Sequence, residues 1–273
     1  METFTPQLLK GKIAFIAGGS SGINLGIAHG LAAAGARISI ISRRIEKVDA
    51  AVAELRAAGG EAMGLAVDVR DYPGVEAALR ATHEAWGPID VIVSGAAGNF
   101  LAPAIGMSAN AFKTVIDIDL LGTFNVLRAS YEFLRRPGAS VISITAGQAV
   151  NPSLFQSHAC AAKAGINMLT KCLALEWGPA GVRVNAIAPG PIKDTEGMAR
   201  LTPTPESEAA LKSVIPLGDY GEKRDIADLA LFLCTDSAKY ITGAILDCDG
   251  GSSLSRIGPA RAPEAPAAAT GSR

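Results

Sequence analysis

One pattern repeats along the chain from Lys12 onward. A short run of β-branched residues is followed by a turn of small residues and then by a stretch with apolar residues three and four positions apart. This pattern is typical of βαβ units, because parallel strands need a long crossover, usually a helix, between them. The runs lack polar alternation, as expected for strands that helices cover on both faces. The sequence therefore predicts an α/β protein with one parallel, doubly wound sheet.

We expect about seven strands with six helices between them. The strands are expected at Ile13–Ala17, Ile38–Ile41, Gly64–Val67, Val91–Val93, Val141–Ile144, Arg183–Ile187 and Ala244–Leu246. The helices are expected at Gly22–Ala34, Arg44–Ala58, Tyr72–Trp86, Ala109–Leu134, His158–Trp177 and Lys223–Cys234. No linker divides these elements, and 49% of the residues are hydrophobic, enough for a full core. The prediction is a single Rossmann-like domain over residues 1–255 with helices on both faces of the sheet.

Two segments depart from the pattern. Residues 193–217 are rich in proline and charge and are too long for a simple connection between strand and helix, so we interpret them as a substrate lid. Residues 256–273 are rich in alanine, proline and glycine, and we expect a disordered tail there.

The charge balance limits the kinds of partner. With 25 basic and 26 acidic residues the net charge is −1, which gives no excess positive potential for a nucleic acid or an anionic membrane. No signal-like N-terminal segment and no long uncharged apolar stretch is present, so we expect a cytoplasmic protein whose partners are small molecules and other subunits. Four scattered cysteines and three histidines offer few metal ligands, and we expect no metal and reduced thiols.

A glycine-rich turn follows the first predicted strand. It reads Gly18-Gly19-Ser20-Ser21-Gly22-Ile23 and leads directly into a helix. Glycines at such a turn let backbone N–H groups approach a pyrophosphate, whose charge the helix N-terminus favours. The turn predicts a dinucleotide site; the alternative is a tight turn that binds nothing.

The residues after the next two strands bear on which dinucleotide binds. Ser42-Arg43-Arg44 stand where NAD enzymes usually place a carboxylate, and arginine suits a 2′-phosphate, so we expect NADP(H). Alternatively, the arginines only solvate a helix start. Asp68-Val69 follow the third strand, and the Asp68 carboxylate either binds the adenine amino group or caps a helix.

Two further motifs complete a family pattern. These are Gly95-Ala96-Ala97-Gly98 after the fourth strand and Pro189-Gly190-Pro191-Ile192 after the sixth. With them the chain resembles the short-chain dehydrogenases/reductases over nearly its whole length. The resemblance implies that the cofactor is bound by Gly18, Ser20, Ser21, Gly22, Ile23, Ser42, Arg43, Asp68, Val69, Gly95, Ala96, Ala97, Lys163, Pro189, Gly190 and Ile192.

The residues that deliver a proton in most of that family are changed here. The family uses a Tyr-x-x-x-Lys pair with a serine and an asparagine. Lys163 matches the lysine, but Ala159 replaces the tyrosine, Ala146 the serine and Asp119 the asparagine. Since the cofactor motifs are kept and Asp119 is itself an acid, the set indicates a changed reaction rather than lost catalysis.

Within the family the chain most resembles the peroxisomal-type 2,4-dienoyl-CoA reductases, which also lack the tyrosine. The motifs that carry this resemblance include Gly95-Ala96-Ala97-Gly98-Asn99-Phe100-Leu101, Asp117-Ile118-Asp119, His158-Ala159 and Thr195-Glu196-Gly197. It implies NADPH-dependent reduction of a conjugated double bond in a 2,4-dienoyl-CoA-like thioester of fatty-acid oxidation. Asp119 would then be the acid, directly or through a water, and Lys163 would orient the nicotinamide ribose and stabilise the dienolate.

Other residues near these motifs are weaker candidates. We expect Phe100, Gln148, Gln156 and His158 to line the substrate pocket, although core packing, loop amides and local hydrogen bonding explain them equally simply. Asn24 replaces the third glycine of the turn, and we expect it to be tolerated because asparagine can adopt the left-handed conformation.

Two other functions stay open at this point. One is a carbonyl reductase in which Asp119 or His158 replaces the tyrosine. The other is an NADP(H)-binding protein without catalysis. For assembly, the apolar helices Ala109–Leu134 and His158–Trp177 exceed what one sheet face can cover, and the resemblance implies a homotetramer.

Overall fold

A computed structural model describes residues 4–254 and contains one parallel sheet of seven strands. The strands lie in the order β3-β2-β1-β4-β5-β6-β7, and each runs parallel to its neighbours. Their bounds are β1 (Ile13–Ala17), β2 (Arg37–Ser42), β3 (Ala62–Ala66), β4 (Val91–Ser94), β5 (Ser140–Ile144), β6 (Arg183–Pro189) and β7 (Ile245–Cys248). The predicted fold, a doubly wound sheet of seven strands, is confirmed.

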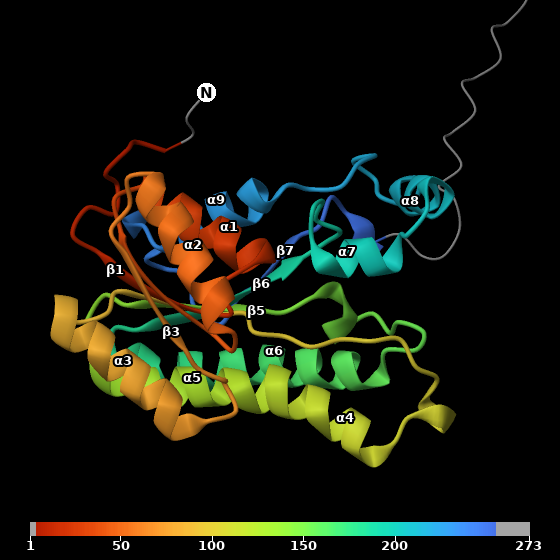
Figure 1. The fold of residues 1–273 in the computed structure, drawn as a ribbon, viewed down its shortest axis with the longest axis horizontal. Coiled ribbons are helices and arrows are strands. Elements are labelled where there is room, and N and C mark those ends of the chain that lie inside the picture. Colours follow the sequence, from red (N-terminus) through yellow and green to blue (C-terminus); the bar gives the residue numbers. More distant parts are fainter. Residues whose placement is uncertain (1–3, 255–273) are drawn as a thin grey trace, which may run out of the picture.

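Helices cover both faces of this sheet. They are α1 (Gly22–Ala33), α2 (Ile45–Ala57), α3 (Tyr72–Trp86), α4 (Ala109–Val115), α5 (Gly122–Ser130), α6 (Ser157–Trp177), α7 (Glu196–Leu201), α8 (Pro205–Lys212) and α9 (Lys223–Leu233). Helices α1, α2 and α9 form the layer on one face, and α3, α5 and α6 form the layer on the other (Figure 1). The sheet is thus buried between two helical layers, which explains its run of Ile, Val and Ala residues.

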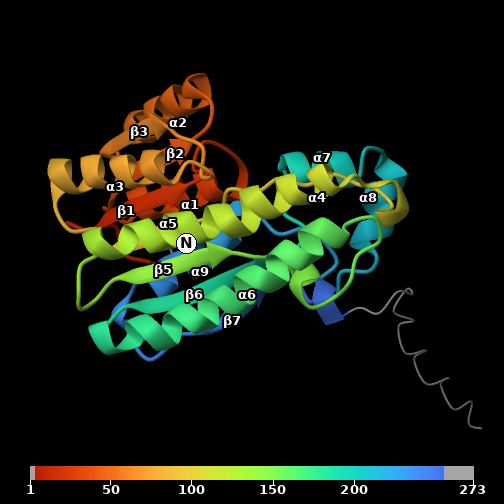
Figure 2. The ribbon, with the colours of Figure 1, turned by 90° about the horizontal axis from the view of Figure 1, so that it is seen from below.

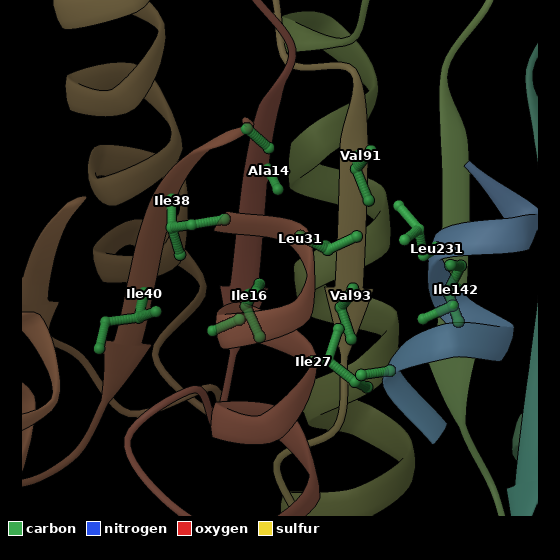
Figure 3. Packing of buried hydrophobic residues seen from close by; sticks show 14 of the residues in the cluster. Ala14, Ile16, Ile27, Leu31, Ile38, Ile40, Val91, Val93, Ile142 and Leu231 are labelled. Carbon is green, nitrogen blue, oxygen red and sulfur yellow. The ribbon is translucent and has the colours of Figure 1, made fainter. Parts of the chain in front are cut away.

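The core on the α1 side joins distant parts of the chain. Ile27 and Leu31 of α1 and Leu231 of α9 pack together against Ile16 and Val93 of the sheet (Figure 3). The two helices approach closely because α1 carries glycines on this face. A Cβ at Gly26 would lie 2.7 Å from the Cβ of Lys223, and one at Gly30 would lie 2.8 Å from the Cβ of Ala227.

The direction of strand order reverses beside β1. Ala14 of β1 pairs with Ile38 of β2 on one side and with Val91 of β4 on the other. The chain therefore leaves β1 toward one edge of the sheet and later returns to build the other half from β4. In open α/β sheets a ligand binds at such a point, at the carboxyl ends of the strands.

The helix expected over Ala109–Leu134 is not one regular α-helix, and that prediction was wrong. A π-helical segment, η2 (Ile116–Leu121), separates α4 from α5. The Gly122 N–H bonds to the Asp117 carbonyl, five residues back. Gly122 also lies against Val69, where a Cβ would come within 2.5 Å of a valine methyl carbon. The wider turn carries Asp119, whose side chain is buried.

The segment interpreted as a lid contains two short helices, α7 and α8, that the sequence pattern did not reveal. Both lie together at one end of the molecule, beyond the sheet (Figures 1 and 2). Each begins with a threonine cap, since the hydroxyl of Thr195 accepts from the Met198 N–H and that of Thr204 accepts from the Ser207 N–H. The predicted tail, 256–273, lies outside the described residues.

Several predicted boundaries shift by one or two residues. The strand β3 begins at Ala62 instead of Gly64, because Ala62 already pairs with Ile38 of β2. Across residues 4–254 no helix is long and apolar enough to cross a membrane. The four cysteines are free thiols.

Candidate active site

A cleft of about 490 Å³ opens at the carboxyl ends of the strands, where the strand order reverses. Every residue predicted to bind the cofactor lines it. These are Gly18, Ser20, Ser21, Gly22, Ile23, Ser42, Arg43, Asp68, Val69, Gly95, Ala96, Ala97, Lys163, Pro189, Gly190 and Ile192. Asp119 lines the same cleft. Residues from six strand ends are therefore brought together as the fold requires.

The glycine-rich turn has the shape of a phosphate cradle. Gly18 adopts a φ of +78°, and a Cβ there would lie 2.9 Å from the Ala96 Cα, so only glycine fits. The first turn of α1 holds no acidic residue, and the Ser21 side chain makes no capping bond to it. The backbone N–H groups at the N-terminus of α1 are therefore available to an anion in the cleft, and the helix dipole favours a negative charge there. Both features suit the pyrophosphate of a dinucleotide.

Three cations line the end of the cleft beside β2. They are Arg43, Arg44 and Lys47, and within the described part of the chain none of them is ion-paired. Lys47 was missed at the sequence level, although its place one turn into the helix after Arg43 was a usable signal. The cluster fits a phosphate better than a ribose diol.

Asp68 also lines this end, but Arg70 engages its carboxylate. The Arg70 guanidinium donates to both carboxylate oxygens, at 3.0 and 2.6 Å. These hydrogen bonds with Arg70 hold the pKa of Asp68 below its usual value. The alternative that Asp68 caps a helix was wrong, because Asp71 stands at the N-terminus of α3.

Asp119 is the buried acid of the site. The residue is only 1% exposed, and its Oδ1 accepts a hydrogen bond of 2.7 Å from the Gly98 N–H. Its Oδ2 lies 3.4 Å from the Lys163 Nζ. Burial raises the pKa of Asp119, and the Lys163 charge and the Gly98 bond offset part of that rise.

Lys163 completes a compact pair of titratable groups. Its Nζ donates to the Ile144 carbonyl at 3.1 Å, which fixes the ammonium beside Asp119. Ala146 and Ala159 also line the cleft, and neither side chain has an acidic group that could donate a proton. In this arrangement Asp119 can donate a proton and Lys163 provides a positive charge. Positions 146 and 159, which carry the serine and the tyrosine in most of the resembled family, can donate no proton.

The predicted substrate residues divide into two groups. Gln148 lines the cleft, as does Asn99, which sequence reasoning did not single out. Gln156 lies behind them, where its Oε1 accepts from the Asn99 Nδ2 at 2.7 Å and from the Gln148 Nε2 at 3.3 Å. The three amides thus form one cluster that presents Asn99 and Gln148 to a ligand.

His158 and Phe100 do not line the cleft. His158 is fully buried, and neither ring nitrogen has a hydrogen-bond partner among the described residues. The Phe100 ring packs edge-on against it, with ring centroids 4.3 Å apart. The two rings therefore pack on each other and are not among the residues that line the cleft.

The segment interpreted as a lid also borders the cleft. Its residues Thr195, Glu196, Gly197, Met198 and Leu201 all line the cleft. The Arg200 Nη1 donates to the Asn99 carbonyl at 3.3 Å and so links α7 to the loop after β4. Residues 4–254 contain no group of three or more His, Cys, Asp or Glu side chains able to hold a metal ion.

Asn24 does not adopt the left-handed conformation that we expected for it. Asn24 lies in the first turn of α1, and its φ is not positive. The side chain of Asn24 fits into this position because the residue opposite, Gly95, has no side chain. A Cβ at Gly95 would lie 2.2 Å from the Asn24 Oδ1.

Comparison with known proteins agrees with this geometry. Residues 17–253 match the family model described as enoyl-(acyl carrier protein) reductase. The chain is 43% identical over 263 residues to a peroxisomal 2,4-dienoyl-CoA reductase of Arabidopsis thaliana, covering 93% of this chain and 88% of that protein. The corresponding protein of Rattus norvegicus is 44% identical over 252 residues, covering 91% of this chain and 86% of that one.

A solved structure has the same fold. A short-chain dehydrogenase from Bacillus anthracis superimposes with a TM-score of 0.80 at 36% identity, covering 89% of this chain and 97% of that chain. The overall fold of this chain is therefore similar to that of a solved short-chain dehydrogenase.

Proposed function

The chain belongs to the short-chain dehydrogenase/reductase family, and from this we propose that it reduces the conjugated double bond of a 2,4-dienoyl-CoA-like thioester in fatty-acid oxidation, with NADPH as reductant. That it is an oxidoreductase of the nicotinamide-binding kind follows from the family. One observation carries the finer proposal: Asp119 and Lys163 form a buried pair in the cleft, whereas alanine stands at positions 146 and 159.

Different residues along the cleft would bind different parts of the dinucleotide. The turn from Gly18 to Ile23 would hold the pyrophosphate of the dinucleotide, and Arg43 with Arg44 would bind its 2′-phosphate. NADPH bound in this way supplies a hydride. The Lys163 ammonium would bind the nicotinamide ribose and stabilise the negative charge that spreads over the dienolate of the substrate.

A dienolate is protonated on carbon, so no donor aimed at a carbonyl oxygen is needed. The raised pKa of Asp119 keeps its carboxyl protonated to a higher pH than an exposed aspartate. Asp119 would give that proton directly or through a water. Asn99 and Gln148 line the cleft and would donate hydrogen bonds to the thioester oxygen.

The test is NADPH oxidation by the purified full chain. A 2,4-dienoyl-CoA should accelerate it, and a panel of ketones and aldehydes should not. Turnover of ketones alone would favour a carbonyl reductase. Tight NADPH binding without turnover of any alkene or carbonyl would identify a binding protein instead, and either outcome rejects the proposal.

The first quantitative prediction concerns Arg43. A charge-assisted contact to the 2′-phosphate contributes about 1.5–3 kcal/mol, so NADPH should bind more than about tenfold tighter than NADH. The variant Arg43→Ala should lose most of that preference while binding NADH as before. Fluorescence titration of both cofactors measures this, and equal affinities in the unaltered protein would contradict it.

A second prediction concerns assembly, which we propose is a homotetramer. Large apolar side chains stay exposed on the α4–α5 and α6 layer. They are Phe112, Leu121, Phe124, Met168 and Leu175. Strand β7 is also an open edge of the sheet. Light scattering at micromolar concentration should give four times the 27.9 kDa of one chain, and a monomeric mass would refute it.

The compartment stays a prediction. The sequence predicts a cytoplasmic protein, while the two curated relatives compared above are named as peroxisomal. Imaging of the tagged full chain in its own cell distinguishes a diffuse from a compartmental distribution.

A further inference from the structure

The carboxamide of Asn24 connects two loops that lie on different sides of the cleft. Its Nδ2 donates to the Gly95 carbonyl at 2.8 Å and to the Gly18 carbonyl at 3.4 Å. Gly18 belongs to the turn after β1, and Gly95 begins the loop after β4. The side chain is 7% exposed and lines the cleft. One buried amide thus spans the point where the strand order reverses.

The space for this amide exists only because position 95 is glycine. The three heavy atoms nearest to a Cβ built at Gly95 all belong to the Asn24 side chain, at 2.2, 2.6 and 2.7 Å. Real Cβ atoms do not approach so closely, so a side chain at 95 and the present position of Asn24 exclude each other. The two residues therefore form a matched pair.

The two loops serve different parts of the site. The turn at Gly18 faces the region assigned above to the pyrophosphate. The loop from Gly95 continues to Gly98, whose N–H holds the carboxylate of Asp119. A fixed distance between these loops sets the position of a dinucleotide relative to the acid.

From this geometry we propose that Asn24 is a positioning residue, which locks the pyrophosphate turn to the loop that holds Asp119, and that Gly95 is its obligatory counterpart. This inference rests on the proposed function, because it assumes that a dinucleotide spans both loops. Asn24 touches no reacting atom in this view. It acts through the backbone of the two loops.

The experiment compares two ligands that differ in how far they reach. NADPH spans both loops, whereas 2′-phospho-ADP lacks both the nicotinamide and its ribose and reaches only the turn at Gly18. In Asn24→Gly, the loss of two neutral hydrogen bonds should weaken NADPH about tenfold. Binding of 2′-phospho-ADP should change less than about twofold, because the turn at Gly18 keeps its own backbone geometry. Titration of each ligand gives both values.

A second variant pair tests the matched fit. Gly95→Ala alone should weaken NADPH more than Asn24→Gly does, because the new Cβ displaces the amide. In the double variant Asn24→Gly/Gly95→Ala the obstruction is gone, so NADPH should bind about as it does to Asn24→Gly alone. This non-additivity is specific to a direct contact between the two positions.

The control is Asn110→Gly, the same exchange at an exposed residue in the first turn of α4. It should leave both ligand affinities unchanged. Equal loss of both ligands in Asn24→Gly, or additive effects in the double variant, would overturn the inference and leave Asn24 a packing residue. If the unaltered protein bound no NADPH, the proposed function would fail first, and the two failures are thus separable.

Discussion

Asp119→Ala should lower kcat for 2,4-dienoyl-CoA reduction by about 10² to 10⁴, the usual contribution of a positioned proton donor. NADPH affinity should change little, because the side chain bonds to Gly98 and Lys163 rather than to the glycine-rich turn. Asp119→Asn should be nearly as slow, since an amide keeps the shape of the carboxyl but donates no proton. Single-turnover NADPH oxidation measures the chemical step alone.

The matched control is Asp117→Ala, in the same π-helical segment. Asp117 pairs with the exposed Lys113 and is not among the residues that line the cleft. Its removal should leave kcat within about twofold, as expected for a surface ion pair of small energy. Wild-type turnover in Asp119→Ala would reject Asp119 as the acid.

The pH dependence supplies an independent readout of the same residue. Burial raises the pKa of Asp119 above its ordinary value, so the proton is present below the raised pKa and is lost as the pH rises through it. The kcat of the unaltered protein should therefore fall as the pH rises through the raised pKa, which gives a descending limb in the plot of kcat against pH. Asp119→Asn should lack the limb, because the amide does not titrate in that range.

Lys163→Met should impair both cofactor binding and turnover. Methionine keeps the volume of the stem but removes a charge that lies beside Asp119 and faces the cleft. The loss of one charge-assisted contact corresponds to about a tenfold to hundredfold weaker NADPH. Turnover should fall further, since the dienolate loses its nearest positive charge. Isothermal titration and single-turnover rates separate these two effects.

The same variant should change how stability depends on pH. Without Lys163, the largest offset to the burial of Asp119 is lost, so its pKa in the folded protein rises further above the unfolded value. The folded state then holds a proton that the unfolded chain releases. The free energy of unfolding should therefore fall as the pH rises from the ordinary carboxyl range through the raised pKa. Lys171→Met, at an exposed position of the same helix, should keep the pH profile of the unaltered protein. A profile in Lys163→Met no steeper than that of the unaltered protein would contradict the coupling.

The sequence was most informative where periodicity and turn chemistry act locally. Strand β1, the turn from Gly18 to Gly22 and helix α1 follow directly from an apolar run, glycines and an amphipathic pattern. The cofactor residues that line the cleft were predicted from the turns that follow individual strands and from the family resemblance. The roles of Asp119 and Lys163 came from the resemblance, and the structure adds their pairing, burial and distance.

What the sequence did not reveal depends on contacts between distant segments. The π-helical segment η2 arises where Gly122 meets Val69, some fifty positions apart in the sequence. The place of Asn24 depends on Gly95, and the buried ring of His158 packs against the distant Phe100. Helices α7 and α8 are too short for a clear apolar period, so only their threonine caps gave a signal.

The close packing of α1 against α9 also determines when this fold can be completed during synthesis. The glycine face of α1 has no partner until Lys223 and Ala227 have left the ribosome, near the end of translation. The first βαβ unit must therefore persist with apolar surface open to water while most of the chain is made. Such exposure makes nascent chains prone to aggregation. Completion of the core depends on a contact between the first and last large helices, so folding is non-local and correspondingly slow.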